Sequence, residues 1–120
     1  MHLAELLGVE VTRSSEDSAT ATLNADVRHL NQGGTVHGGA IATLVDIAMG
    51  AAVFAGEDDD ARPVTIEMKL NYLDAGKEGP LRAVATVRRR GSRFTVLEAE
   101  VTQEERVVAF ATGSFTTVAS

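Results

Sequence analysis

A single carboxylate, Asp46, lies within an apolar run that has the spacing of a helix. Between residues 40 and 55 the only polar residues are Thr43 and Asp46, and a helix that is apolar nearly all round is typical of a protein interior. Burying an ionised carboxylate without partners costs several kcal/mol of folding free energy. We therefore expect Asp46 to lie in a largely dry place and to perform chemistry there. The alternative is that it only accepts hydrogen bonds from a neighbouring loop or strand.

Small residues lie near Asp46 on the same face of the expected helix: Gly39, Ala42, Thr43 and Gly50. A glycine inside a helix costs about 0.5–1 kcal/mol relative to alanine, so Gly50 indicates that another group approaches the helix closely. This stripe leaves room for a foreign group beside the carboxylate.

The segment His37-Gly38-Gly39 begins the same helix. The first amides of a helix have no intrahelical acceptor and lie at the positive end of the helix dipole, and the two glycines carry no side chain to shield them. Such a place suits an anion or a polarised carbonyl oxygen. The alternative is a plain junction between a loop and a helix. Asn31, six residues before His37, and Asp46, nine residues after it, favour the functional interpretation.

One long helix and six strands are expected to position these residues. Apolar residues at 41, 44, 45, 48, 49, 52 and 53 predict a helix from about Gly38 to Ala55. A shorter helical segment from His2 to Leu7 is expected to end at Gly8. Alternating polar and apolar residues predict strands at 9–13, 17–24, 62–73, 80–90, 93–103 and 106–117. This order favours an α+β fold in which an antiparallel sheet wraps around the helix.

The motif NQGGTVHGGAIATLVDIAMGAA, followed by PVTIEMKLNYL, resembles the hotdog-fold acyl-CoA thioesterases of the PaaI type, the phenylacetyl-CoA thioesterases and their relatives. The resemblance implies a hotdog fold, with residues 1–120 as a single domain. It also implies hydrolysis of an acyl-CoA thioester, with an aromatic or medium-chain acyl group, to the free acid and coenzyme A. No separate cofactor is expected, because coenzyme A is part of the substrate.

The resemblance also implies a role for each residue of the motif. Asp46 acts as general base or as nucleophile, and the Gly38 N–H polarises the thioester carbonyl. Asn31 helps to place the thioester or the water, His37 orients the loop and the leaving thiolate, and Thr65 holds the carboxylate or the water. By themselves, Asn31 and Thr65 are also ordinary residues of turns and strands.

Helix geometry predicts that the site is shared between two chains. Gly38 and Asp46 are eight residues apart, which is about 12 Å along a helix axis, yet both must come within about 3 Å of one thioester group. Two antiparallel helices related by a twofold axis bring them together. One chain then supplies Asn31 and Gly38, and the other supplies Asp46 and Thr65. The resemblance agrees, since relatives are homodimers that often pair into tetramers.

Four arginines, Arg88, Arg89, Arg90 and Arg93, gather within six positions of an otherwise acidic chain. Arginine is well shaped for phosphate groups, and in related thioesterases this hairpin lies near the nucleotide end of coenzyme A. We therefore expect the four side chains to bind the phosphates of coenzyme A. The alternative is a solvated hairpin tip whose charges protect a sheet edge.

The composition excludes several other functions. The chain has no cysteine, which removes disulfides, cysteine zinc sites and thiol nucleophiles. The net charge of −6 argues against binding to nucleic acid or to an anionic membrane. No segment is expected to offer the roughly 18 apolar residues of a membrane span, so a cytoplasmic location is expected. The three histidines lack metal-ligand spacing, and no metal site is expected.

Two other activities stay open at this point. A hydroxyacyl dehydratase also uses a hotdog fold, although it pairs its helix carboxylate with a catalytic histidine in motifs that this chain lacks. A non-catalytic acyl-CoA sensor would bind the same ligand without hydrolysing it.

Overall fold

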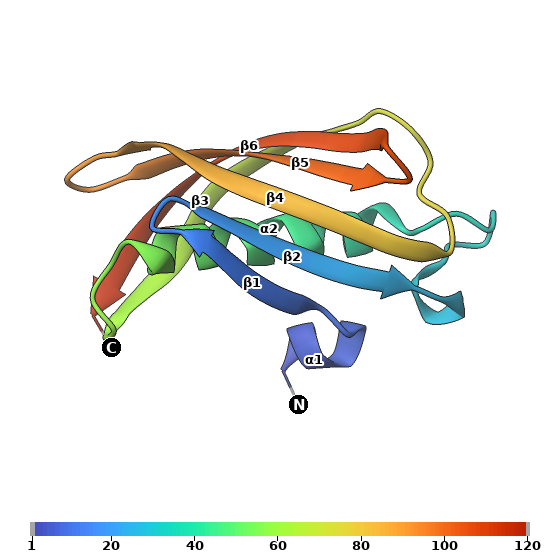
Figure 1. Ribbon diagram of the computed structural model, residues 1–120, viewed down its shortest axis with the longest axis horizontal. Coiled ribbons are helices and arrows are strands. Elements are labelled where there is room, and N and C mark those ends of the chain that lie inside the picture. Colours follow the sequence, from blue (N-terminus) through green and yellow to red (C-terminus); the bar gives the residue numbers. More distant parts are fainter. Residues whose placement is uncertain (1, 120) are drawn as a thin grey trace.

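A six-stranded antiparallel sheet wraps around one long helix in the computed structural model, which describes residues 2–119 (Figure 1). The helices are α1 (Leu3–Leu7), the 3-10 helix η1 (Val27–His29) and α2 (Gly38–Ala55). The strands are β1 (Glu10–Ser15), β2 (Ser18–Ala25), β3 (Ala61–Tyr72), β4 (Gly79–Arg90), β5 (Thr95–Gln103) and β6 (Arg106–Ala119). Their order across the sheet is β1-β2-β4-β5-β6-β3, so β1 and β3 are the two edge strands.

Small side chains on the concave face let the sheet close around α2. The strand registers align one alanine from each of four neighbouring strands, and all four are buried: Ala19, Ala85, Ala99 and Ala111. Two residues after Ala111 on β6, and so on the same face, a Cβ on Gly113 would lie 2.7 Å from the Met49 sulfur. The absence of a side chain at Gly113 therefore lets Met49 pack directly on the sheet, since buried atoms essentially never come so close.

The expected α+β architecture is confirmed. The predicted helix from Gly38 to Ala55 has those bounds, and the ends of the predicted strands differ from the observed ones by two residues at most. One element was missed, the 3-10 helix η1, within a segment expected to be loop. Its polar cap explains it: the Asp26 carboxylate accepts a hydrogen bond from Arg28 N, and His29 Nδ1 accepts one from Asp26 N.

The expectation that α2 is buried all round is wrong for this single chain. Eight residues of the helix face the sheet and are buried, but the opposite face is only half-buried. Asp46 and Gly50 lie on that half-buried face, and so do Ala42, Thr43 and Ile47. The sheet covers one side of the helix, and the described residues leave the other side open.

The expectation that no segment is long and apolar enough to span a membrane is also wrong, because α2 meets both criteria. The 18 residues of α2 have a mean hydropathy of 1.7, which is enough for a membrane span by length and composition alone. In the structure this helix packs along the concave face of the sheet and supplies much of the core (Figure 1). Its apolar character is explained by that packing.

Candidate active site

The carboxylate of Asp46 is held by a hydroxyl from the edge strand. Thr65 Oγ1 donates a hydrogen bond to Asp46 Oδ1 at 2.6 Å, which joins the middle of α2 to the first part of β3. The pairing of β3 with β6 is irregular between Thr65 and Glu67, and such bulges re-aim side chains near functional sites. Asp46 is half-buried and not fully enclosed, so its second oxygen is free to meet water or substrate.

His37 closes the amino end of α2. Its Nδ1 accepts a hydrogen bond from Gly39 N at 2.8 Å, so the neutral ring carries its proton on Nε2. The Gly39 amide is therefore not a free donor, contrary to the expectation for both glycines. Gly38 N–H meets no acceptor among the described residues, and it is the amide that stays available at the positive end of the helix dipole.

Asn31 shapes the loop that leads into α2. Its Oδ1 accepts hydrogen bonds from Gly33 N at 2.9 Å and from Thr35 N at 3.2 Å, and its Nδ2 donates to Thr35 Oγ1 at 3.0 Å. Gly34, inside this turn, has a φ of +84°, which glycine adopts without strain. The Asn31 side chain thus organises the loop, and it does not contact Asp46 of the same chain.

Two backbone hydrogen bonds fasten the end of this loop to the body of the protein. His37 N donates to His29 O at 2.8 Å, and Val36 N donates to Gly76 O at 2.8 Å. The His29 ring is buried and bonds at both nitrogens, to Asp26 N and to Leu7 O. The loop before Gly38 is therefore anchored on both sides.

Tyr72, at the end of β3, is a residue of the site whose contact the sequence did not reveal. Its hydroxyl donates a hydrogen bond to Gly38 O at 2.7 Å. The available signal was an aromatic residue within the motif NYL, but a strand pattern does not tell which helix atom a tyrosine hydroxyl reaches. β3 thus touches both parts of the site, through Thr65 at Asp46 and through Tyr72 at Gly38.

The single chain does not bring the Gly38 amide and the Asp46 carboxylate together. They are eight positions apart on one straight helix, or about 12 Å along its axis. Two hollows on the described surface lie away from both residues, one at the tip of the β4–β5 hairpin and one over the outer face of β4, β5 and β6. Within residues 2–119, no group of three or more His, Asp or Glu is placed to hold a metal ion.

The four arginines have different surroundings. Arg90 bonds inside the chain, to the carbonyls of Ala52 and Val53 at 3.3 and 3.0 Å and to Glu16 O at 2.9 Å. It also forms ion pairs with two acidic residues, at 3.2 Å with Asp17 and at 3.5 Å with Glu57. The guanidinium of Arg90 therefore closes the carboxyl end of α2 and is not open to a ligand.

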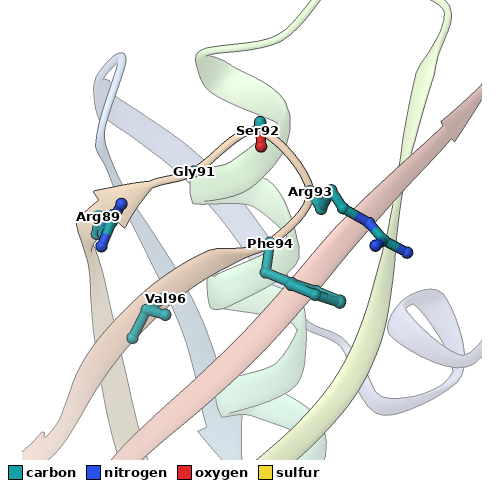
Figure 2. Close-up of a pocket in the computed structure, with 6 residues that line it drawn as sticks. All are labelled: Arg89, Gly91, Ser92, Arg93, Phe94 and Val96. Carbon is teal, nitrogen blue, oxygen red and sulfur yellow. The ribbon is translucent and has the colours of Figure 1, made fainter.

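The remaining three arginines are exposed. Arg88 forms an ion pair with Glu98 at 3.5 Å. Arg89 and Arg93 line the hairpin hollow of about 340 Å³ together with Phe94. Figure 2 shows Arg93 and Phe94 extending on the side of the hairpin toward β6, while Arg89 lies on β4. The Arg93 guanidinium lies 5.7 Å from the centroid of the Phe94 ring. Neither Arg89 nor Arg93 has an acidic partner within residues 2–119, so both can meet an anion.

Comparisons with known proteins assign the chain to a family. Residues 33–110 match the family model described as Thioesterase superfamily. A conserved protein of Pseudomonas aeruginosa is similar in structure, with a TM-score of 0.94 and 36% identity over 98% of this chain and 94% of that one. The PaaI protein from the phenylacetic acid degradation operon of Escherichia coli has a TM-score of 0.87 and 25% identity, over 98% and 84% of the two chains.

A curated relative is also similar in sequence. The 1,4-dihydroxy-2-naphthoyl-CoA hydrolase of Escherichia coli is 25% identical over 104 residues, which are 87% of this chain and 76% of that protein. The family match covers well over half of the chain, and the antiparallel sheet around a central helix is the hotdog fold that the motif implied. This chain therefore belongs to the thioesterase superfamily.

Proposed function

We propose that this protein hydrolyses an acyl-CoA thioester at a site shared by two copies of the chain. The observation that carries the proposal is a pair of complementary groups on α2, one on its open face and one at its amino end. A carboxylate is held by Thr65 at 2.6 Å, and an amide donor, Gly38 N–H, has no acceptor within residues 2–119 of its own chain. A base and a donor for a developing oxyanion are what thioester hydrolysis requires.

The open face of α2 supports assembly with a second chain. Among the described residues, a Cβ at Gly50 would meet only Phe115, at 3.8 Å, which is an ordinary contact, so none of them requires glycine there. Glycine inside a helix costs about 0.5–1 kcal/mol of stability relative to alanine. A glycine at this position would allow a partner helix to approach α2 closely, which explains why it is there. The edge strand β3 also exposes Val64 and Ile66, which adds apolar surface for a partner chain to cover.

Two antiparallel copies of α2 then complete two identical sites. Gly38 and Asn31 of one chain lie beside Asp46 and Thr65 of the other, because a twofold axis sets the amino end of each helix against the middle of its partner. The homodimer is the smallest assembly with this site, and pairing of two dimers is a further part of the proposal. Light scattering of the purified protein measures the assembly directly.

The reaction proceeds through a tetrahedral intermediate. In the first route, Asp46 takes a proton from water, and the resulting hydroxide attacks the thioester carbonyl carbon. The Gly38 N–H of the partner chain stabilises the negative charge that develops on the carbonyl oxygen. The intermediate then collapses, the C–S bond breaks, and the thiolate of coenzyme A takes up the proton.

In the second route, Asp46 attacks the carbonyl carbon itself, the C–S bond breaks, and the thiolate of coenzyme A leaves as a mixed anhydride forms. Water then attacks the Asp46 carbonyl carbon of this anhydride, so the acid departs with an oxygen from Asp46. A single turnover in water labelled with oxygen-18 separates the two routes. The nucleophile route places unlabelled oxygen from Asp46 in the first product, whereas the base route labels the product at once.

The acyl group is proposed to be aromatic or of medium chain length. The similar PaaI protein comes from a phenylacetic acid degradation operon, and the similar curated relative is a hydrolase of an aromatic naphthoyl-CoA. A panel of aromatic and straight-chain acyl-CoAs, followed with a thiol reagent that detects free coenzyme A, ranks these substrates.

The same assay tests the whole proposal with Asp46→Asn. The amide keeps an oxygen that accepts from Thr65 but cannot act as a base, so the rate should fall by at least about 100-fold while the fold persists. Release of thiol from no member of the panel would favour a non-catalytic sensor. Hydration of an enoyl-CoA without thiol release would favour a dehydratase.

The hairpin hollow is proposed to meet the nucleotide end of coenzyme A. Arg89 and Arg93 would pair with its phosphates, and Phe94, 48% exposed, would offer the base the ring face that the Arg93 guanidinium does not cover. Arg89→Gln with Arg93→Gln should raise the KM for acyl-CoA but not for the matching acyl-pantetheine, which lacks the nucleotide. Arg88→Gln is the matched control. An equal rise in KM for both thioesters would show that the hollow does not bind the nucleotide of coenzyme A.

A further inference from the structure

Gly38 lies between two peptide units whose polar groups are almost all hydrogen-bonded. In the first unit, His37 O accepts from Ala40 N at 2.9 Å. In the second unit, Gly39 N donates to His37 Nδ1 at 2.8 Å, and Gly38 O accepts from the Tyr72 hydroxyl at 2.7 Å. Of these four groups, two carbonyls and two amides, Gly38 N–H alone has no hydrogen-bond partner among the described residues. The other three groups therefore fix its direction.

The Tyr72 ring also packs against the backbone of Gly38. A Cβ at Gly38 would lie 3.3 Å from both Cζ and Oη of Tyr72, closer than most buried atoms approach. Only glycine leaves the ring this much room. Glycine is also the residue with the widest backbone freedom, whereas a donor that stabilises a developing charge is effective when it is held in place before the reaction. Tyr72 limits the freedom that Gly38 would otherwise have.

The hydroxyl of Tyr72 has no evident part in the core. The side chain is 50% exposed and lies outside the set of buried residues that fill the space between sheet and helix. A phenylalanine could make the same ring contact. The hydroxyl adds one hydrogen bond, and its acceptor belongs to the residue whose amide faces the substrate in the proposed function.

We infer that Tyr72 is a positioning residue, which holds the Gly38 amide in the direction that the thioester oxyanion needs. The inference rests on the proposed function, since it assigns Gly38 N–H as the donor. Tyr72 acts through the hydrogen bond to Gly38 O and through the packing of its ring. It contributes to the rate of the chemical step and not to the affinity for substrate.

Tyr72→Phe tests the inference because it keeps the ring and removes the hydroxyl. The expected result is a fall in kcat of about ten-fold, smaller than the loss of the donor itself, with KM within about two-fold of wild type. Asn71→Ala is the matched control, because Asn71 is the neighbour on β3 with its side chain on the opposite face. A purely structural role of Tyr72 would lower stability and leave kcat of the folded protein unchanged.

A double-mutant cycle separates action through Gly38 from any other action. Gly38→Pro removes the N–H donor, so Tyr72→Phe should lower kcat no further in that background. A full additional loss in the double variant would overturn the inference. In parallel, the nitrogen and proton chemical shifts of the Gly38 amide, measured by NMR, should change in Tyr72→Phe and stay as in wild type in Asn71→Ala.

The NMR measurement also separates the two proposals. If wild type hydrolyses no thioester but the Gly38 amide resonance moves in Tyr72→Phe, the proposed function fails while the positioning contact stands. If the protein is an active thioesterase and neither kcat nor the resonance responds to Tyr72→Phe, the positioning role is wrong.

Discussion

The two ends of α2 leave unpaired backbone groups, and the protein treats these groups in opposite ways. At the carboxyl end, the guanidinium of Arg90 bonds to the carbonyls of Ala52 and Val53, so the chain itself closes this end. At the amino end, His37 accepts from the Gly39 amide, but the Gly38 amide has no acceptor in the part of the chain that the structure describes. Every helix has such unpaired groups at both ends. In α2 an arginine side chain binds those at the carboxyl end, whereas one amide at the amino end stays available.

This difference separates stability from function along one helix. The Arg90 contacts join α2 to β4 and to the turn between β1 and β2, through Glu16 and Asp17, so they hold elements together. The contacts around Gly38 hold a single donor in place and leave it free. Changes at the carboxyl end should therefore affect folding, and changes at the amino end should affect the rate of hydrolysis.

The largest effect is expected from removing the free amide at the amino end. Proline is favoured at the first position of a helix, and His37, with φ −58° and ψ 134°, already has the backbone that precedes a proline. Gly38→Pro should therefore preserve the fold while it lowers kcat by about 100-fold to 1,000-fold. Steady-state kinetics with an acyl-CoA substrate measures this loss.

The matched control for Gly38→Pro is Gly38→Ala. Both substitutions place a Cβ at 3.3 Å from Tyr72, but alanine keeps the N–H. The difference in kcat between the two variants isolates the donor from the crowding. Equal kcat values in the two variants would show that the Gly38 amide does not take part in hydrolysis. The amino end of α2 would then have no functional role that distinguishes it from the carboxyl end.

The next largest effect is expected on stability at the carboxyl end. Arg90→Met removes the side-chain donor from the Ala52 and Val53 carbonyls, of which Val53 O keeps Gly56 N at 3.3 Å. It also leaves the carboxylates of Asp17 and Glu57 without their cation. The free energy of unfolding should fall by roughly 2–4 kcal/mol, as measured by urea denaturation. Arg88→Met, in the same strand, removes only the exposed pair with Glu98 and should cost less than about 1 kcal/mol. Similar losses in both variants would contradict the assigned role of Arg90.

A smaller effect is expected from a surface ion pair that supports the amino end. Arg106 Nη1 lies 2.6 Å from Asp74 Oδ2, and the hydrogen bond from Arg106 holds the pKa of the Asp74 carboxyl below its ordinary value of 3.8. Asp74 precedes Gly76, whose carbonyl receives Val36 N from the site loop. The pair therefore helps to hold that loop.

The sign of its pH dependence follows from the lowered pKa. The stabilisation is fully present above pH 3.8, the ordinary value, and is lost as the pH falls through the lower value of the folded protein. Arg106→Gln should therefore be less stable than wild type at neutral pH, and the two should converge in strong acid. Urea denaturation of both proteins across this pH range measures the difference in their free energies of unfolding. A difference that grows as the pH falls would contradict the assigned pH dependence.

Much of the fold could be predicted from the sequence because its patterns are local. The buried Leu81 and Ala83 lie on either side of the exposed Arg82 along β4, and this period of two separates the buried face from the other one. The helix bounds followed from the spacing of apolar residues and from the glycines before it. Asp46 and Gly38 could be predicted as site residues for two reasons. A carboxylate is unusual in an apolar helix, and a glycine at the start of a helix leaves its amide without a side chain to cover it.

Other features depend on contacts between distant segments, and no local pattern contains them. Arg90 looks like its neighbours in the sequence, yet it alone reaches the carboxyl end of α2, 37 residues earlier in the chain at Val53. The contact from Tyr72 to Gly38 spans 34 residues and depends on how β3 lies along the helix. The half-buried state of Asp46 depends on what a single chain leaves uncovered, whereas helical periodicity reports only apolar character.

The central claim is that the donor and the carboxylate of one site come from different chains, and mixing two inactive variants tests it most directly. Gly38→Pro and Asp46→Asn chains, each inactive alone, are unfolded together in equal amounts and refolded. Half of the random dimers are mixed, and each of these holds one intact site of two, so about a quarter of the wild-type activity should return. No recovery, while wild type carried through the same procedure regains full activity, would contradict the shared site.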